Sequence, residues 1–136
     1  MTDLDGDRAG DLLAGLPADG SGSLQLRHEI VDGAVVVHAL GEVDMATRKL
    51  LDLQLQAAES QVVPPAPVVL DLTGVTFLAS VGLSLLVEHH ERCAESGSRL
   101  VLVANDRVVL RPMQITGLDN LVTIVPTVQA ALAAIS

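Results

Sequence analysis

The dipeptide Asp32-Gly33 constrains the fold more than any other short feature of this 136-residue chain. Before it, residues 24–30 alternate apolar and polar side chains, which is the period-2 pattern of a half-buried strand. After it, residues 34–40 are almost wholly apolar, as expected of a central strand. An Asp-Gly pair readily adopts the positive φ angles of a two-residue hairpin turn. The sequence therefore predicts that the domain opens with an antiparallel hairpin.

Beyond the hairpin, amphipathic segments alternate with short apolar runs. The predicted helices span residues 45–60, 80–95, 106–116 and 127–135, and the predicted strands span residues 68–72, 99–104 and 121–125. Gly41–Asp44 is predicted to be a loop, with Asp44 capping the helix that follows. Strands that alternate with helices favour a mainly parallel sheet. We expect an α/β fold with that sheet, the N-terminal antiparallel hairpin and about four helices.

The chain divides into a tail and one domain. Residues 1–22 are rich in Asp, Gly, Ala and Ser, which predicts an acidic and mostly disordered tail. Its apolar cluster is Leu12, Leu13 and Leu16, so a docking role is the alternative. Residues 23–136 fit a single domain. Within it, the helix from Ser80 has a predicted apolar stripe, which makes His90 partly buried and hydrogen-bonded. The stripe consists of Leu83, Leu86, Val87, His90 and Ala94.

Charge and composition exclude several classes of function. The net charge is −9 with only eight Lys and Arg residues, which argues against binding to nucleic acid or to an anionic membrane. No apolar run approaches the ~20 residues that span a bilayer, and no signal peptide is evident, so we expect a cytoplasmic protein. The single cysteine, Cys93, excludes an internal disulfide and a multi-cysteine zinc site. We expect no metal and no cofactor.

The sequence does not favour an enzyme. The four histidines have no metal-ligand spacing, and neither a nucleophile elbow nor a phosphate-binding or dinucleotide-binding glycine motif is present. A nucleophile pair of Ser80 with a histidine is the remaining catalytic hypothesis. It requires a histidine or a carboxylate within hydrogen-bond reach of Ser80 Oγ.

Ser80 is the residue of greatest interest. It directly precedes a predicted helix, where a serine hydroxyl can cap free backbone N–H groups. A phosphate there would add a charge of about −1.5 to −2 at the positive end of the helix. Gly82 costs a helix ~1 kcal/mol relative to alanine. This glycine is therefore better explained by the close approach of another part of the protein than by the stability of the helix.

These residues resemble a known family. Asp71–Leu86 reads D-L-T-G-V-T-F-L-A-S-V-G-L-S-L-L. It is similar to the signature of the STAS domain (sulfate transporter and anti-sigma factor antagonist), which is approximately apolar-D-L-[ST]-x-V-x-F-[ML]-D-S-[ST]-G-L-[GA]. Gly41-Glu42-Val43-Asp44, continuing to Ala46-Thr47, is similar to the G-E-[LV]-D-x-x-T loop of that family. The two motifs have the order and approximate spacing of the family, over about residues 24–135.

The resemblance implies an anti-sigma factor antagonist, a phosphoprotein that regulates transcription by partner switching, as in stress responses. Such a protein binds an anti-sigma factor, usually one with a histidine-kinase-like ATPase fold. That partner phosphorylates the first serine of the D-S-[ST]-G motif, which aligns with Ser80, and a PP2C-type phosphatase reverses the step. The implied partner-binding residues are Gly41, Glu42, Val43, Asp44, Ala79, Ser80, Val81, Gly82 and Ser84.

Two residues depart from the family pattern. Ala79 stands where an acidic residue is expected, and Val81 stands where a second Ser or Thr is expected. Ser84 is the only nearby substitute acceptor. The alternative function is therefore a STAS sensor or scaffold module that is not phosphorylated and binds a small ligand or a partner protein.

Overall fold

The computed structural model describes residues 23–133, so the predicted acidic tail of residues 1–22 lies outside the described residues. The strands are β1 (Leu24–Val31), β2 (Ala34–Val43), β3 (Val68–Leu78), β4 (Leu100–Val103) and β5 (Thr123–Val125). The helices are α2 (Arg48–Gln61), α3 (Ser80–Glu95), α4 (Arg107–Thr116), the 3₁₀ helix η1 (Leu118–Asn120) and α5 (Val128–Ala133). None of these helices is long and apolar enough to cross a membrane.

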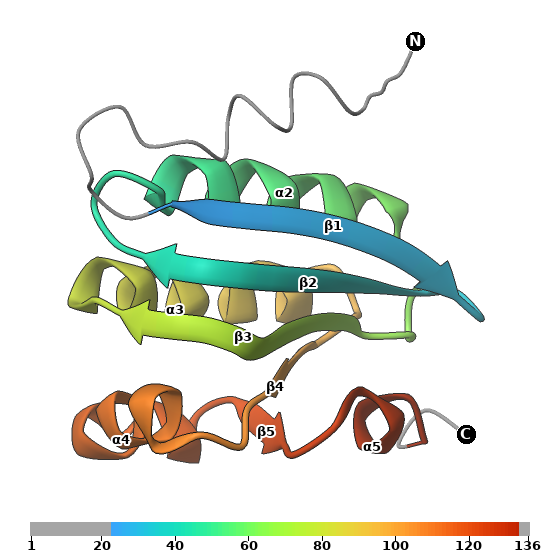
Figure 1. The fold of residues 1–136 in the computed structure, drawn as a ribbon. Helices are drawn as coiled ribbons and strands as arrows, with labels where there is room; N and C mark the ends of the chain where they lie inside the picture. The colour runs from blue at the N-terminus through green and yellow to red at the C-terminus, as the bar shows by residue number, and fades with distance from the viewer. Residues whose placement is uncertain (1–22, 134–136) are drawn as a thin grey trace, which may run out of the picture.

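The five strands form one sheet in the order β1-β2-β3-β4-β5 (Figure 1). β1 is antiparallel to β2, and the remaining neighbours are parallel, which confirms the predicted α/β fold. The hairpin turn has the predicted geometry, since Asp32 and Gly33 have φ angles of 51° and 87°. The two residues that flank the turn, Val31 and Ala34, are paired.

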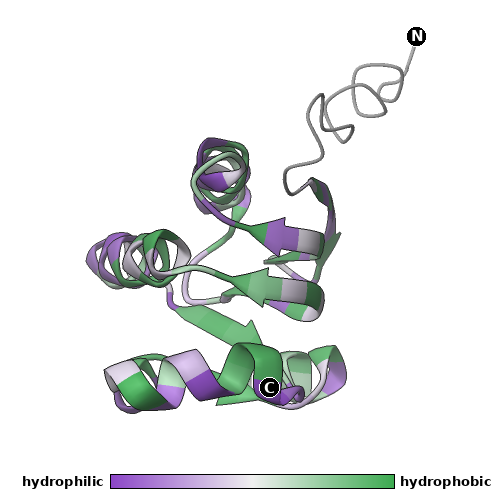
Figure 2. Ribbon diagram, turned by 60° about the vertical axis from the view of Figure 1, so that its left-hand side comes forward, coloured by the Kyte–Doolittle hydropathy of each residue, from purple (hydrophilic) through white to green (hydrophobic). Residues whose placement is uncertain are grey.

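Alternate side chains of the strands contribute to cores on the two faces of the sheet. Val35 and Val37 pack with buried leucines of α2 and α3 and with Met113 of α4. Val36, on the opposite face, belongs to a smaller cluster with Ala131 of α5. Figure 2 shows strands that are mostly hydrophobic in the middle of the molecule, and helices that carry hydrophilic segments. Helices α2 and α3 therefore lie on one face of the sheet, whereas on the other face α5 packs against β3, β4 and β5.

Two strands extend further than the sequence analysis predicted. β2 continues through Gly41–Val43, which was predicted to be a loop, and β3 continues to Leu78 instead of ending at Leu72. β2 and β3 remain paired here because two register shifts accommodate the irregular stretch, one between His38 and Leu40 and one between Gly41 and Glu42. The two motif segments consequently end on neighbouring strands.

The buried face of α3 also differs from the prediction. His89, only 1% exposed, takes the buried position that was predicted for His90, and Ala94 of the predicted stripe is exposed. The buried residues of α3 are Gly82, Leu83, Leu85, Leu86, His89 and Cys93. The reason is that α2 supplies two carboxylates, Asp52 and Glu59, to the imidazole of His89. These hydrogen bonds join His89 to residues more than twenty-five positions earlier in the chain.

Candidate functional site

The two segments singled out in the sequence meet at the carboxyl ends of β2 and β3. In the parallel register, Glu42 is paired with Phe77 and Val43 with Leu78. The pairing is extended by Ala79, whose backbone N–H donates to the carbonyl oxygen of Val43 at 2.9 Å. Residues 41–44 and the start of α3 therefore form one continuous edge of the molecule, which we call the Ser80 edge.

Gly41 has a conformational reason to be glycine. Its φ angle is +118°, and a Cβ there would lie 2.2 Å from the carbonyl oxygen of Ser23. The same oxygen of Ser23 accepts a hydrogen bond of 2.8 Å from the backbone N–H of Glu42. Gly41 therefore lets the chain that enters β1 lie against β2 at this edge.

Asp44 and Thr47 fix the turn between β2 and α2. Asp44 Oδ1 accepts from the backbone N–H groups of Ala46 (2.9 Å) and Thr47 (3.1 Å). The hydroxyl of Thr47 donates to the carbonyl oxygen of Glu42 at 2.7 Å and accepts from the N–H of Asp44 at 3.0 Å. Asp44 thus stabilises a turn that precedes α2, and the helix begins at Arg48 and not at Met45 as predicted. Thr47 belongs to the G-E-[LV]-D-x-x-T motif, but its role in this turn was not predicted from the sequence.

Ser80 is exposed and is the first residue of α3, so it follows the N-cap position by one residue. Ala79 occupies the N-cap position with an extended backbone, so the prediction that the Ser80 hydroxyl caps the helix is wrong. That hydroxyl makes no hydrogen bond to any other residue between 23 and 133. The Ser80–histidine hypothesis therefore loses its geometric basis, and the hydroxyl belongs to an exposed residue.

The neighbours of Ser80 divide into packed and exposed residues. Gly82 is buried, and a Cβ there would lie 2.7 Å from Val43 Cγ1 and 2.8 Å from Leu78 Cδ1. The close approach predicted for Gly82 is therefore made by the two strand ends. Ala79 and Val81 are half-buried, whereas Ser84 is exposed one turn after Ser80.

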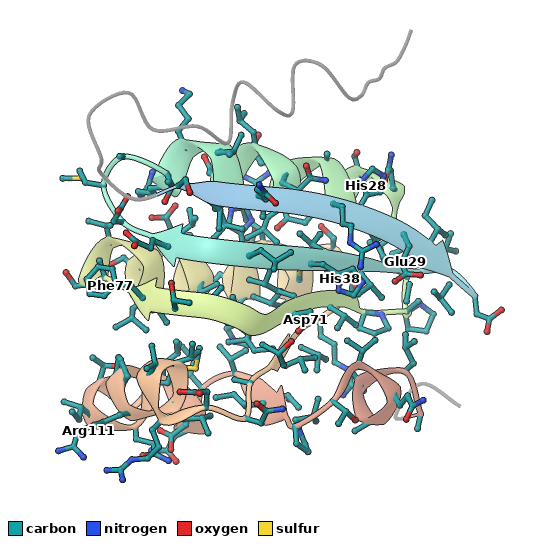
Figure 3. The ribbon with its side chains drawn as sticks, viewed as in Figure 1. His28, Glu29, His38, Asp71, Phe77 and Arg111 are labelled. Carbon is teal, nitrogen blue, oxygen red and sulfur yellow. The ribbon has the colours of Figure 1, made fainter. Side chains whose placement is uncertain are left out.

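Exposed apolar side chains accompany the Ser80 edge, and sequence reasoning missed them. Phe77, the only aromatic residue of the chain, is 50% exposed, and Met45 in the turn before α2 is 77% exposed. Figure 3 shows Phe77 at the end of β3. A signal was present in the sequence, because the only aromatic residue of the chain stands three positions before the motif serine.

Two adjoining grooves border Ser80 on its α4 side. The first has a volume of about 280 Å³ and lies along Leu83, Ser84 and Val87 of α3, closed by Thr116–Leu118. The second, about 460 Å³, is lined by Leu78, Leu83, Arg107, Val108, Arg111 and Ile115 among others. Ser80 lines both grooves. The serine therefore stands between two hollows with mostly apolar walls.

Two histidines are held by carboxylates outside the Ser80 edge. His89 bonds to Glu59 and, at 2.7 Å, to Asp52, while Arg92 donates to Glu59 at 2.9 Å. Burial alone would lower the pKa of His89, but the hydrogen bonds and charges of Glu59 and Asp52 outweigh it and raise that pKa. The imidazole of His89 therefore joins α3 to α2.

The second histidine, His38, bridges β1, β2 and β3. It lies 2.7 Å from Glu29 and 2.7 Å from Asp71 (Figure 3). Burial would raise the pKa of Asp71, but hydrogen bonds from Thr73 and His38 lower it overall. Among residues 23–133, no group of three or more His, Cys, Asp or Glu side chains is arranged so that it could hold a metal ion. Burial raises the pKa of the Cys93 thiol to about 12, so this cysteine is a packing residue.

Comparison with known proteins gives a consistent set of relatives. The family model of the STAS domain matches residues 25–131. The anti-sigma-F factor antagonist RsfA of Mycobacterium tuberculosis is 32% identical over 103 residues, which cover 76% of this chain and 80% of RsfA.

Solved structures agree with that comparison. The crystal structure of an anti-sigma factor antagonist from Mycobacterium paratuberculosis is 36% identical, with a TM-score of 0.75 over 82% of this chain and 93% of that one. The unphosphorylated form of the anti-sigma factor antagonist SpoIIAA from Bacillus shares the fold, with a TM-score of 0.68 at 19% identity over 81% of this chain and 95% of that one.

Proposed function

The chain belongs to the STAS domain family of anti-sigma factor antagonists, and we propose that it binds an anti-sigma factor through the Ser80 edge and is released when Ser80 is phosphorylated. Anti-sigma factor antagonists are non-enzymatic regulators. The proposal includes a partner with a histidine-kinase-like ATPase fold as the kinase and a PP2C-type phosphatase that restores binding. Both act in the cytoplasm, where the sigma factor is controlled.

One observation carries the proposal. The pairing of Val43 with Leu78, extended by the bond from Ala79 N–H, places both motif segments on one edge and leaves the Ser80 hydroxyl free there. Phe77 and Met45 supply exposed apolar surface of the kind that is enriched in protein interfaces. A surface with a central modifiable hydroxyl and apolar flanks is suited to reversible binding of a protein.

The position of Ser80 in α3 supports a phosphate switch. The N–H groups of the first helical turn and the helix dipole favour a negative charge at this end, so the phosphate is compatible with the folded domain. Burying a charge of about −1.5 to −2 in an apolar interface at this edge would nevertheless carry a large desolvation cost. Phosphorylation should therefore weaken binding without unfolding the protein.

The test compares three variants in the presence of the cognate anti-sigma factor and ATP. Intact mass should increase by one phosphate for the wild type and for Ser84→Ala, the matched control one turn later, but not for Ser80→Ala. Ser80→Glu should bind the partner much more weakly than Ser80→Ala does. Equal phosphate incorporation in Ser80→Ala and wild type would exclude Ser80 as the acceptor.

The result also decides between the proposal and the module that is not phosphorylated. That alternative rests on Ala79 and Val81, which replace the acidic and hydroxyl neighbours of the motif serine. It requires no mass increase in any variant and equal partner binding by wild type and Ser80→Glu. Treatment of the phosphorylated wild type with a PP2C-type phosphatase should restore binding if the proposed cycle operates.

A further inference from the structure

The groove between Ser80 and α4 combines an apolar floor with a basic rim. Val108 and Ile115 of α4 are 47% and 72% exposed along it, although both are large aliphatic residues. Arg107 and Arg111 line the same groove and stand four residues apart on α4, so they lie on one side of the helix. Figure 3 shows the Arg111 side chain extending from α4 into solvent. This basic-apolar surface is called the α4 groove below.

The two arginines place two positive charges on one groove of an acidic protein. The chain has eight Lys and Arg residues against seventeen Asp and Glu. Arg48 and Arg92 are paired with glutamates, whereas Arg107 and Arg111, like Arg27, Lys49 and Arg99, form no ion pair with another residue in the described range 23–133. The adjacent Asp106 is engaged at the start of α4, where its carboxylate accepts from the N–H of Val108 at 2.8 Å. The α4 groove therefore favours an occupant that is both acidic and apolar.

We propose that residues 1–22 of the same chain dock in the α4 groove and cover Ser80. This segment carries five aspartates against a single arginine, which complements the pair of arginines. It also carries Leu12, Leu13 and Leu16, aliphatic side chains suited to the exposed surface of Val108 and Ile115. The docking itself does not depend on the function proposed above. Only the effect of docking on Ser80 phosphorylation rests on the proposed function.

The point where the segment joins the domain makes this docking possible. Ser23 lies against Gly41 and bonds to Glu42, so the segment leaves from the end of the sheet that holds the Ser80 edge. Neighbouring strands are about 4.8 Å apart, and α4 packs against β3. An extended chain covers about 3.3 Å per residue, so the stretch between Leu16 and Ser23 spans roughly 23 Å. That reach is sufficient to pass from β1 across β2 and β3 to α4 (Figure 1).

Docking would make the segment an autoinhibitory element. A bound segment shields the Ser80 hydroxyl from a kinase and occupies apolar surface that a partner would need. Because attraction between exposed aspartates and arginines is screened by ions, raising the salt concentration should release the segment.

Paramagnetic NMR on the full chain tests the proposal. A spin label is attached to Gly10→Cys in a Cys93→Ala background, and amide spectra are compared with those of the reduced label. We expect broadening of Val108, Ile115 and Thr116 that is lost in Arg107→Glu/Arg111→Glu and at high salt. The docking is overturned if the α4 amides are not broadened, or if their broadening persists in Arg107→Glu/Arg111→Glu.

Two further measurements complete the test. In the first, a spin-labelled chain without ¹⁵N is mixed with a ¹⁵N-enriched chain that carries no label. We expect no broadening in this mixture. Broadening would mean that a second copy supplies the occupant, which overturns the intramolecular proposal. With the kinase, Leu12→Ser/Leu13→Ser/Leu16→Ser should raise the rate of Ser80 phosphorylation, and an unchanged rate overturns the covering of Ser80. Broadening of α4 without any phosphorylation would contradict only the function proposed above.

Discussion

Gly82 of α3 packs directly on Val43 of β2, since a Cβ on Gly82 would come within 2.7 Å of Val43 Cγ1. Gly82→Ala should therefore destabilise the domain although alanine is the better helix former. Overpacking of a tight core costs about 1–3 kcal/mol, which exceeds the ~1 kcal/mol gained from helix propensity. We expect the free energy of unfolding, measured in urea, to fall by about 1–2 kcal/mol.

The paired substitution Val43→Ala identifies the cause. It removes the Val43 methyl groups and leaves the contact with Leu78 Cδ1, so Gly82→Ala should cost less in the Val43→Ala background than in wild type. The coupling in this double-mutant cycle should be about 0.5 kcal/mol or more. Strictly additive effects would mean that the contact with Val43 is not the reason for the glycine.

Thr47 is the second residue on which the shape of the Ser80 edge depends. Thr47→Val keeps the side-chain shape but removes the hydroxyl that bonds to Glu42 and Asp44. Because Thr47 is 6% exposed, water cannot readily replace these bonds, and we expect a loss of about 1–3 kcal/mol in unfolding free energy. Thr47→Ser should recover most of that loss; a Thr47→Val variant as stable as wild type would contradict the role of the hydroxyl.

The sequence predicted features that depend on neighbouring residues. The hairpin at Asp32-Gly33 and the order of strands and helices follow from local turn chemistry and hydrophobic periodicity. The close approach at Gly82 was also predictable, because glycine near the start of a helix is locally unfavourable.

The errors concern features set by distant partners. Residues 41–43 become strand because β3 pairs with them, which no local pattern around Gly41 indicates. His89 is buried instead of His90 because Asp52 and Glu59 on α2 bond to it. Ser80 is not the cap because Ala79, tied to Val43, takes that position. Each outcome was decided by tertiary contacts.

The buried His89 should make stability depend on pH. Its pKa in the folded protein is raised above the ordinary 6.5. The stabilisation is therefore fully present below about pH 6.5 and is lost as the pH rises through the folded pKa. Between pH 6 and pH 9, urea unfolding should show a larger loss of stability for wild type than for His89→Gln.

His90→Gln is the matched control for this prediction. His90 is the adjacent residue on α3, half-buried, and its side chain makes no hydrogen bond to another residue in the described part of the chain. The variant should follow the pH dependence of wild type. Measurements stay above pH 5 so that Asp52 remains ionised, since its pKa is lowered by its bonds to His89 and Gln56 despite the opposing effect of burial. Parallel pH curves for wild type and His89→Gln would contradict the assignment.

Phe77 should contribute to partner binding more than to folding. Its ring is half exposed beside Glu42, at the Ser80 edge, so truncation removes little buried surface. Aromatic residues are enriched among the few positions that dominate binding energy at interfaces. Phe77→Ala should therefore weaken binding of the anti-sigma factor at least about tenfold, which corresponds to about 1.4 kcal/mol, in a calorimetric titration.

Leu53→Ala separates this effect from a general loss of apolar surface. Leu53 is 52% exposed, close to the 50% of Phe77, but lies on α2 away from the Ser80 edge. Both variants should keep the unfolding free energy within about 0.5 kcal/mol of wild type, as is usual for exposed positions. Only Phe77→Ala should change the affinity for the partner. Equal affinities of the two variants would mean that the partner makes no specific contact with the Phe77 ring and binds elsewhere.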